Sequence, residues 1–578
     1  MLAWLAIALT WFVTLQIRPL LDPDEGRYAE IPREMLASGD WVTPRLDGLL
    51  YFEKPPLQYW ATAAAYAVFG ESEWTSRLWA VGLGLACLGL VYLWTRREYG
   101  ERAGRAALVA LAVSPYFVIV AHLNLLDSGF TFWLIGVVFA FCLAQGAAPG
   151  SAEERRWMLA TWLAAALAVL SKGIVVGVLA GVALVAYSVL ERDARPWKRL
   201  HLVAGVPLFL CVTAPWFVLV SERNPGFLQF FFVHEHFARF LTKVHQRYEP
   251  WWYFIPIMLV ATLPWLVTLV RRCRGAWADA PRPDARFRPL RFLLIFAATT
   301  FVFFSVSDSK LAPYVLPIIP VLAAVVGSAS SERVRSISGA ASADGTAPGT
   351  ASSAAGGVTI TGGTASSTAS STASSTTSGT IITGSAWAGA WAVTVVALGL
   401  LFYSWHRNGV VPLSVWLWSL AAVVVAWAGA LRVRSVTDPY ATGVVVAVAV
   451  SAIAAWQFLL CAFAATPPPR SARDLVAAVR PYVHPNTQLY SVGQFRQTIL
   501  PYLRRTVTVV GYEGELSFGL HADGGKGAAT LDEFASRWSS SSDAVAFIAP
   551  SDWPILQKRG LPGRVIAADS ETVVVDRQ

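Results

Sequence analysis

The sequence predicts a polytopic α-helical membrane protein that carries a small α/β domain at its C-terminal end. Of 578 residues, 55% are hydrophobic and 14% are charged, and this composition excludes an ordinary soluble domain. Most apolar residues fall in long runs of the kind that forms transmembrane helices. Beyond residue 465 these runs stop, and short helix-like and strand-like segments alternate instead. We therefore predict a membrane domain over residues 1–465 and an α/β domain over residues 466–578.

Thirteen apolar runs are long enough, or nearly long enough, to cross a hydrocarbon core of about 30 Å. They span residues 1–17, 74–95, 105–122, 129–147, 157–170, 173–190, 200–220, 251–270, 289–306, 311–328, 386–403, 410–431 and 441–465. The first run lacks a basic start and a small-residue cleavage site, so we expect a retained helix rather than a signal peptide. Another run, at residues 57–69, is too short to cross and is rich in aromatic residues, which predicts an interfacial helix.

The distribution of arginine predicts how the chain is oriented in the membrane. Arginines cluster in alternate loops, most densely over residues 271–291, and such loops are typically cytoplasmic. The net charge of +9 is then a sign of topology and does not indicate nucleic-acid binding. One loop on this side, residues 329–385, is Ser/Thr/Ala/Gly low complexity and predicts a flexible linker. The opposite side receives the loops 22–73 and 221–250 and the C-terminal domain.

The first loop on that opposite side, residues 22–73, concentrates acids, bases and aromatic residues between two apolar runs. Charges at a membrane surface stay solvated and can act on lipid headgroups, so this loop is the expected site of chemistry. Two simpler interpretations stay open. Asp24 can cap an interfacial helix together with Glu25 and Arg27. Glu30 and Arg33, with Glu34 beside them, have the spacing of surface ion pairs on a helix.

The polar residues of this loop form a recognisable pattern. It reads D-E-x-R-Y-A-E-x-x-R-E-M-L-x-S-G-D-W over residues 24–41 and continues at 51–55 with Tyr-Phe-Glu-Lys-Pro. Together with Lys172-Gly173, the segment 234–240 and the segment 309–314, it resembles the polyprenyl-phosphate-sugar-dependent C-type glycosyltransferases. Among these it is most similar to the bacterial lipid A 4-amino-4-deoxy-L-arabinose transferases. The chain departs from their pattern at Gly26, where a threonine is expected.

The resemblance implies an all-α polytopic domain of the C-type glycosyltransferase fold, in the bacterial inner membrane. The active site and the C-terminal domain would face the periplasm. The implied reaction moves 4-amino-4-deoxy-L-arabinose from undecaprenyl phosphate to a lipid A phosphate, with inversion at the anomeric carbon, and gives resistance to polymyxin and other cationic peptides. The alternative is a related transferase that acts on protein hydroxyls or another glycan. A lipid transporter is disfavoured, because the apolar runs carry almost no charge and show no repeat.

Residue roles follow from the resemblance and from what sugar transfer requires. Asp24 and Glu53 are the candidate catalytic carboxylates. Lys54 and Arg27 are candidates for a cationic clamp on the leaving phosphate, with Lys310 and Tyr314 as outer partners. A carboxylate must act as a base if the acceptor is a hydroxyl, whereas a phosphate acceptor is already ionised. Further candidates for substrate binding are Tyr28, Tyr51, Lys172, Asp127 and Arg239.

We expect no required cofactor, and the expected partners are the undecaprenyl-phosphate sugar donor, lipid A and membrane lipids. A divalent metal such as zinc remains an option at Glu53 and His234, because carboxylate and imidazole suit such ions. The five cysteines show no spacing typical of metal ligands. Lys172 and Lys310 have a simpler interpretation as side chains that extend from helix ends toward the interface.

Overall fold

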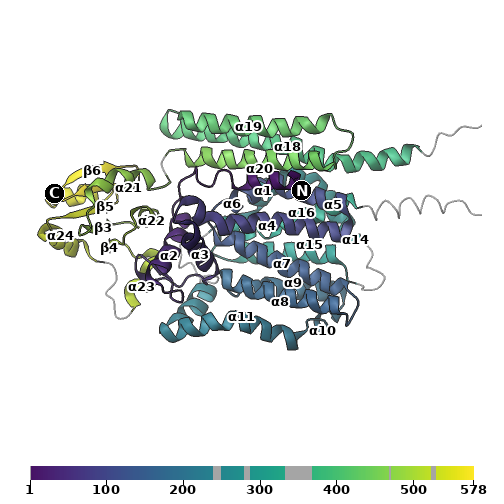
Figure 1. Cartoon of the computed structure of the whole chain (residues 1–578), viewed down its shortest axis with the longest axis horizontal. Coiled ribbons are helices and arrows are strands. Elements are labelled where there is room, and N and C mark those ends of the chain that lie inside the picture. The colour runs from purple at the N-terminus through teal and green to yellow at the C-terminus, as the bar shows by residue number, and fades with distance from the viewer. Residues whose placement is uncertain are drawn as a thin grey trace, which may run out of the picture.

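The molecule consists of a large group of long helices and a smaller domain that lies at one end of them (Figure 1). This computed structural model describes residues 2–238, 249–278, 287–331, 368–467, 470–522 and 529–577. The helices of the larger part are α1 (Leu2–Phe12), α4 (Glu73–Tyr99), α5 (Glu101–Val113), α6 (Pro115–Ala121), α7 (Leu126–Gly146), α8 (Ala152–Lys172), α9 (Val175–Glu191), α10 (Arg195–Lys198), α11 (Leu202–Arg223), α13 (Phe254–Thr262), α14 (Leu266–Ala278), α15 (Pro289–Val306), α16 (Ile318–Gly327), α18 (Thr368–Asn408), α19 (Leu413–Arg434) and α20 (Thr442–Ala464). Shorter helical turns are η1 (Gln229–Ala238), η2 (Leu263–Trp265), η3 (Ala312–Val315) and η4 (Ser328–Ser330).

The larger part is the predicted helical membrane domain. Within the described residues, nine helices are long and apolar enough to cross a membrane, or ten if α5 and α6 count as one bent span. These two helices meet at 71°, because Pro115 has no N–H to donate and disfavours a helical conformation at Ser114. α1, α8 and α9 fall outside this count, so thirteen spans stay a prediction. The predicted linker 329–385 also needs a correction, since α18 begins within it at Thr368.

The first loop folds into α2 (Asp24–Ser38), a hairpin of β1 (Arg45–Leu46) and β2 (Leu49–Leu50), and α3 (Leu57–Phe69). α3 coincides with the apolar run predicted to lie in the interface. Asp47 and Gly48 join the two strands with φ angles of 58° and 74°. Positive φ at both central residues is typical of a two-residue hairpin turn, and Asp-Gly is a favoured sequence for it.

A buried ion cluster fixes the start of α2 against the membrane helices. The Glu25 carboxylate accepts hydrogen bonds from Arg18 Nη1 at 2.9 Å and from Arg77 Nε at 2.7 Å. It also accepts one from the backbone N–H of Asn124 at 2.9 Å. Burial alone would raise the pKa of Glu25, but the two arginines and these hydrogen bonds lower it to about 2. Glu25 is therefore ionised, and it holds α2 onto α4.

The ion pair between Glu30 and Arg33, which was expected on the surface of α2, is largely buried. Glu30 is fully buried, and its carboxylate accepts hydrogen bonds from Arg33 at 2.6 and 2.7 Å. The expectation of a surface pair is wrong here because α3 and the C-terminal domain cover this helix. Asp24 also makes no capping bond at the start of α2; its carboxylate contacts Arg27 instead.

The C-terminal domain is an α/β domain built on a five-stranded sheet with strand order β4-β3-β5-β7-β6. The β3–β4 and β3–β5 pairs are parallel, and the β5–β7 and β6–β7 pairs are antiparallel. Phe534 and Trp538 pack their rings near Tyr490 of the sheet. The elements are α21 (Arg473–Val479), η5 (Arg480–Tyr482), β3 (Gln488–Val492), α22 (Ile499–Leu503), β4 (Thr508–Val510), η6 (Gly514–Leu516), α23 (Ser517–His521), α24 (Leu531–Ser540), β5 (Ala544–Ile548), α25 (Trp553–Lys558), β6 (Arg564–Ala568) and β7 (Val573–Asp576).

Polar contacts join this domain to the first loop. The Asp22 carboxylate accepts hydrogen bonds from Arg496 Nε at 2.8 Å and from the backbone N–H of Thr498 at 2.8 Å. Asp47 accepts one from the backbone N–H of Val507 at 2.7 Å. Burial raises the pKa of Asp47 to about 8, with this hydrogen bond opposing the shift. The two domains thus meet through two carboxylates of the first loop, the half-buried Asp22 and the buried Asp47.

Gly26 sets how closely the two domains approach. A Cβ atom at this position would lie 2.6 Å from the backbone nitrogen of Thr498 and 2.7 Å from the carbonyl carbon of Gln497. Real Cβ atoms do not come this close to backbone atoms, so a side chain would force the domains apart. The glycine that departs from the expected threonine therefore allows direct contact between α2 and the C-terminal domain.

Candidate active site

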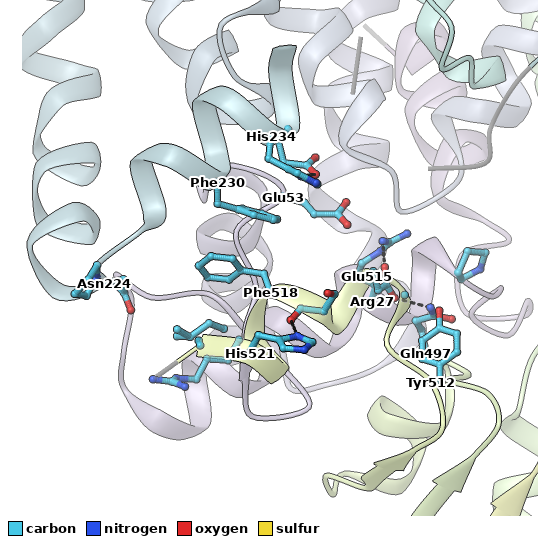
Figure 2. Close-up of a pocket in the computed structure, with 18 of the residues that line it drawn as sticks. Arg27, Glu53, Asn224, Phe230, His234, Gln497, Tyr512, Glu515, Phe518 and His521 are labelled. Atoms are coloured by element: carbon cyan, nitrogen blue, oxygen red, sulfur yellow. Dashed lines mark hydrogen bonds and ion pairs between the residues drawn. The ribbon is translucent and has the colours of Figure 1, made fainter. Parts of the chain in front are cut away.

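A cavity of about 1110 Å³ lies between the first loop, the segment after α11 and the C-terminal domain. Figure 2 shows that residues from all three regions point into it. Its wall is formed by Pro23, Arg27, Arg45, Leu50, Glu53, Arg223, Asn224, Pro225, Phe230, His234, Glu235, Gln497, Tyr512, Gly514, Glu515, Ser517, Phe518, His521 and Ala522. The mixture of charged and aromatic groups suits a substrate that has both a charged and an apolar part.

Arg27 lines the cavity and is only 4% exposed. Its guanidinium forms ion pairs with Asp24 on the same helix and with Glu515 of the C-terminal domain. Nη1 also donates a hydrogen bond to the Tyr51 hydroxyl at 2.9 Å, and the guanidinium lies 5.3 Å from the Tyr28 ring. The structure thus brings four predicted residues together, Asp24, Arg27, Tyr28 and Tyr51. It adds an acid from the other domain.

Glu515 is held in place from both sides. Its other oxygen accepts a hydrogen bond from Gln497 Nε2 at 2.6 Å. Burial raises the pKa of Glu515, although the positive charge of Arg27 opposes this shift. Arg27 is therefore paired with two carboxylates, Asp24 from its own helix and Glu515 from the other domain.

Glu53 lines the same cavity as Arg27, and Lys54 is the next residue in the chain. Lys54 Nζ donates a hydrogen bond to the Glu53 carbonyl at 2.7 Å and pairs with Glu235 at 3.3 Å. Glu235 belongs to η1 and its side chain is 1% exposed. The Glu53 carboxylate points into the cavity, between His234 and the Arg27–Glu515 pair (Figure 2). Glu53 therefore faces the cavity, and Lys54 is connected to it through its pair with Glu235, which lines the cavity.

The predicted residues Lys172, Asp127, Tyr314 and Lys310 do not line this cavity. Lys172 at the end of α8 pairs with Asp127 at the start of α7, and its ammonium lies 4.7 Å from the Tyr314 ring. Lys310 is buried and donates hydrogen bonds to the carbonyls of Glu249 at 2.9 Å and Ser307 at 2.5 Å. Lys310 therefore turns inward rather than toward solvent.

Two further predictions concern Arg239 as a substrate-binding residue and a metal site at Glu53 and His234. Arg239 lies outside the described residues. Glu53 and His234 both line the cavity, but no group of three or more His, Cys, Asp or Glu side chains that could hold a metal occurs among the described residues. A divalent ion at these two residues would need further ligands from substrate or water.

Sequence reasoning missed the contribution of the C-terminal domain. Gln497, Tyr512, Glu515 and His521 reach the cavity from this domain. Phe518 adds an apolar wall, since its ring centre lies 4.4 Å from that of Phe230 in the segment after α11. These residues come from short turns without hydrophobic periodicity, so no pattern in the sequence singles them out.

Comparisons with known proteins agree with this architecture. Residues 5–277 match the family of dolichyl-phosphate-mannose-protein mannosyltransferases, and residues 475–577 match the aminoarabinose transferase C-terminal domain. The undecaprenyl phosphate-alpha-4-amino-4-deoxy-L-arabinose arabinosyl transferase of Pseudomonas paraeruginosa is 34% identical over 337 residues. This alignment covers 57% of the chain and 59% of that relative, so the chain matches less than two thirds of the curated relative's length.

The solved structures extend the match to the whole chain. The crystal structure of ArnT from Cupriavidus metallidurans bound to undecaprenyl phosphate has a TM-score of 0.79 and 32% identity. The alignment covers 100% of this chain and 97% of that one, and the apo structure gives the same TM-score at 31% identity. The helical domain and the α/β domain together thus form the fold of a C-type glycosyltransferase. The chain belongs to the family of ArnT-like aminoarabinose transferases, which confirms the resemblance drawn from the sequence.

Proposed function

We propose that this protein transfers 4-amino-4-deoxy-L-arabinose from undecaprenyl phosphate to a phosphate group of lipid A. The observation that carries the proposal is the cavity between the two domains, which is lined by a buried arginine and several carboxylates, one of them paired with Lys54. The names of the similar proteins supply the donor and the sugar, and the cavity offers matching groups for each part of the substrates.

In this proposal Lys54 is the group that stabilises the leaving phosphate. An oxygen of the acceptor phosphate attacks the anomeric carbon, and the bond from that carbon to the donor phosphate oxygen breaks. The bonding electrons go to undecaprenyl phosphate, whose extra negative charge needs a nearby cation. The support for this role is that Lys54 pairs with Glu235, which lines the cavity, and donates a hydrogen bond to the Glu53 carbonyl. Attack opposite the leaving group inverts the anomeric configuration.

The carboxylates account for the amino sugar. An ammonium group on the sugar gains from ion pairing in a partly buried site. Glu53 and Glu515 line the cavity, and Asp24 lies beside them through its ion pair with Arg27. These carboxylates are the groups with which a positively charged sugar would pair.

The acceptor decides whether a base is needed. A lipid A phosphate is already ionised near neutral pH, so no proton has to leave during its attack. Asp24 would then orient substrate and stabilise charge. A protein hydroxyl would lose a proton and would require Asp24 or Glu53 as a general base. The match of residues 5–277 to protein mannosyltransferases makes this second acceptor the relevant alternative.

We place the cavity on the periplasmic side of the inner membrane. The first loop and the C-terminal domain are in contact, so both lie on the same side of the membrane. An even number of transmembrane spans must therefore connect them. All nine apolar spans come after the first loop, so nine crossings alone would leave the two on opposite sides. Adding the bent α5–α6 pair together with α8 and α9 gives twelve, and α1 makes the predicted thirteen.

Mass spectrometry of lipid A tests the proposal. The full chain would be expressed in bacteria that make the undecaprenyl-phosphate aminoarabinose donor but lack their own transferase. We expect lipid A to gain aminoarabinose, and Lys54→Ala to lower the transfer rate by roughly 10²-fold or more. Lys558→Ala, in the C-terminal domain away from the cavity, is the matched control and should retain activity. Unmodified lipid A together with sugar on a protein acceptor would favour the alternative. Wild-type transfer by Lys54→Ala, to either acceptor, would refute the assignment of Lys54 to the site.

A further inference from the structure

A second pocket, of about 320 Å³, lies where the membrane helices meet the C-terminal domain. It is formed by the segment after α1, the start of α19, the end of α20 and the residues that lead into α21. The lining residues are Ile17, Arg18, Pro19, Ser414, Trp418, Cys461, Ala464, Ala465, Thr466, Pro467, Arg470, Ser471, Arg473 and Asp474. None of these residues lines the cavity of Arg27, so the pocket is a separate site.

The pocket carries excess positive charge. Arg470, Arg473 and Arg18 contribute three cations, and Asp474 is the one acid in the lining. Asp474 is 94% exposed and only 3.4 Å from Arg473, so water weakens that pair. Arg18 is paired with Glu25, but Glu25 shares its single charge between Arg18 and Arg77. The floor of the pocket therefore remains positive, and an anion is the expected occupant.

Arg470 is positioned for an anion rather than for an acid of this protein. Its guanidinium lies 4.5 Å from the ring centre of Phe463, near the end of α20, and the side chain is exposed. No ion pair of Arg470 with a carboxylate occurs among the described residues. Stacking on an aromatic ring fixes the plane of a guanidinium while leaving its N–H groups free to bind oxygen atoms. The hydroxyls of Ser414 and Ser471 add further donors to the lining.

The surroundings of the pocket indicate a lipid. Val13 and Ile17 on one side are 58% and 49% exposed, and Leu413 and Leu417 on α19 are 72% and 57% exposed. Apolar side chains exposed along membrane spans face acyl chains. Trp418 lies in the lining, and tryptophan is enriched at the level of lipid headgroups. A molecule with a phosphate in the pocket can therefore extend its acyl chains over α1 and α19 without leaving the bilayer.

From this combination we propose that the pocket binds the phosphate of an anionic glycerophospholipid from the leaflet next to the C-terminal domain. Basic pockets between transmembrane helices are known to select anionic headgroups, with each arginine near the surface strengthening the attraction. The volume suits one small headgroup. A bound lipid would connect α1, α19 and α20 to the linker before α21, and so help to hold the C-terminal domain on the membrane domain.

Native mass spectrometry of the purified full chain tests this site. Equal amounts of phosphatidylglycerol and phosphatidylcholine would be added, and the lipid retained by the protein counted. We expect the wild type to retain phosphatidylglycerol in preference. The double variant Arg470→Gln/Arg473→Gln should lower this retention by about 10- to 30-fold, the loss expected for two headgroup contacts. Ser414→Glu places an acid at the mouth of the pocket and should lower retention independently.

The controls separate a pocket from general surface charge. Arg537→Gln/Arg559→Gln removes two exposed arginines of the C-terminal domain that do not line the pocket, and should leave retention unchanged. Equal retention of both lipids by the wild type, unchanged retention in both pocket variants, or an equal loss in the control would overturn the proposal. A competition arm with lipid A distinguishes the source. Displacement of phosphatidylglycerol by equimolar lipid A at this pocket would also overturn it, since the acceptor would then be the occupant.

Discussion

Glu25 and Arg27 are two residues apart on α2 and both lie in ion clusters, yet the clusters differ in what they leave open. Glu25 faces the membrane helices, and both its oxygens are bound by arginines and backbone N–H groups. Arg27 faces a large cavity and is shared by carboxylates from two domains. One cluster is closed and internal, whereas the other borders open space.

The difference teaches how a single charged motif can serve two purposes. A closed cluster has no capacity to bind substrate, so its contribution is to fix where α2 begins. A cluster that borders a cavity can direct its electrostatic field at a substrate that binds there. The closed cluster positions the open one, because both are carried by the first turn of the same helix. Loss of Glu25 should therefore affect folding, and changes near Arg27 should affect activity.

The largest expected effect comes from opening the closed cluster. Glu25→Ala would leave Arg18 and Arg77 buried without their shared partner, at a cost of about 3–5 kcal/mol in the free energy of unfolding. We expect little folded protein, measured as the monodisperse fraction in size-exclusion chromatography. Glu571→Ala, at an exposed carboxylate, is the control and should give normal yield. Normal yield and melting temperature for Glu25→Ala would contradict the structural role assigned to this cluster.

The contact between the domains offers a smaller perturbation. Gly26→Ala places a methyl group against the backbone of Thr498, and overpacking of this kind costs about 1–3 kcal/mol. The C-terminal domain should shift away from α2 and carry Glu515 with it, lowering transfer activity about tenfold while the membrane domain stays folded. Gly82→Ala is the matched control, because this helical glycine has open space around it and should show no loss. Equal activity of the two variants would mean that close approach at Gly26 is not needed.

The smallest effect concerns pH. The pKa of Asp47 is raised from 3.8 to about 8 in the folded protein, mainly by burial. The contribution of protonated Asp47 to the free energy of unfolding is therefore fully present below about pH 4. This contribution is lost as the pH rises through 8. Asp47→Asn keeps an oxygen for the Val507 N–H and tolerates a positive φ. We expect this variant to be more stable than the wild type at pH 8, with little difference near pH 4. Melting temperatures across this range would check the sign, and a wild type that gains stability with rising pH would contradict it.

Much of the fold could be predicted because periodic or uniform patterns determine it. The run at 57–69 coincides with α3, and the alternating short segments predicted beyond residue 465 are the helices and strands of the C-terminal domain. The first loop could also be assigned to the site, because charges this dense at a membrane surface can act on lipid headgroups. The hairpin at Asp47-Gly48 carries a recognisable turn signal and was open to prediction as well.

The other half of the site could not be predicted, for physical reasons. Glu515 lies in η6, a single turn whose side chains follow no repeat, and only the docking of a whole domain brings it to Arg27. The burial of Glu30 has the same origin, because its spacing to Arg33 is equally suited to a solvated helix face. Sequence patterns report local structure, whereas these positions depend on contacts between residues hundreds of positions apart.

The central claim is that the C-terminal domain completes the site of sugar transfer, and Glu515→Gln tests it most directly. This change keeps the shape of the side chain and removes the charge that pairs with Arg27. Purified full-length protein would be given undecaprenyl-phosphate aminoarabinose and lipid A, and the rate of lipid A modification measured against Glu571→Gln. We predict that kcat/KM falls about 10²-fold in Glu515→Gln at an unchanged melting temperature. Wild-type kcat/KM in a correctly folded Glu515→Gln protein would contradict the claim and confine the active site to the membrane domain.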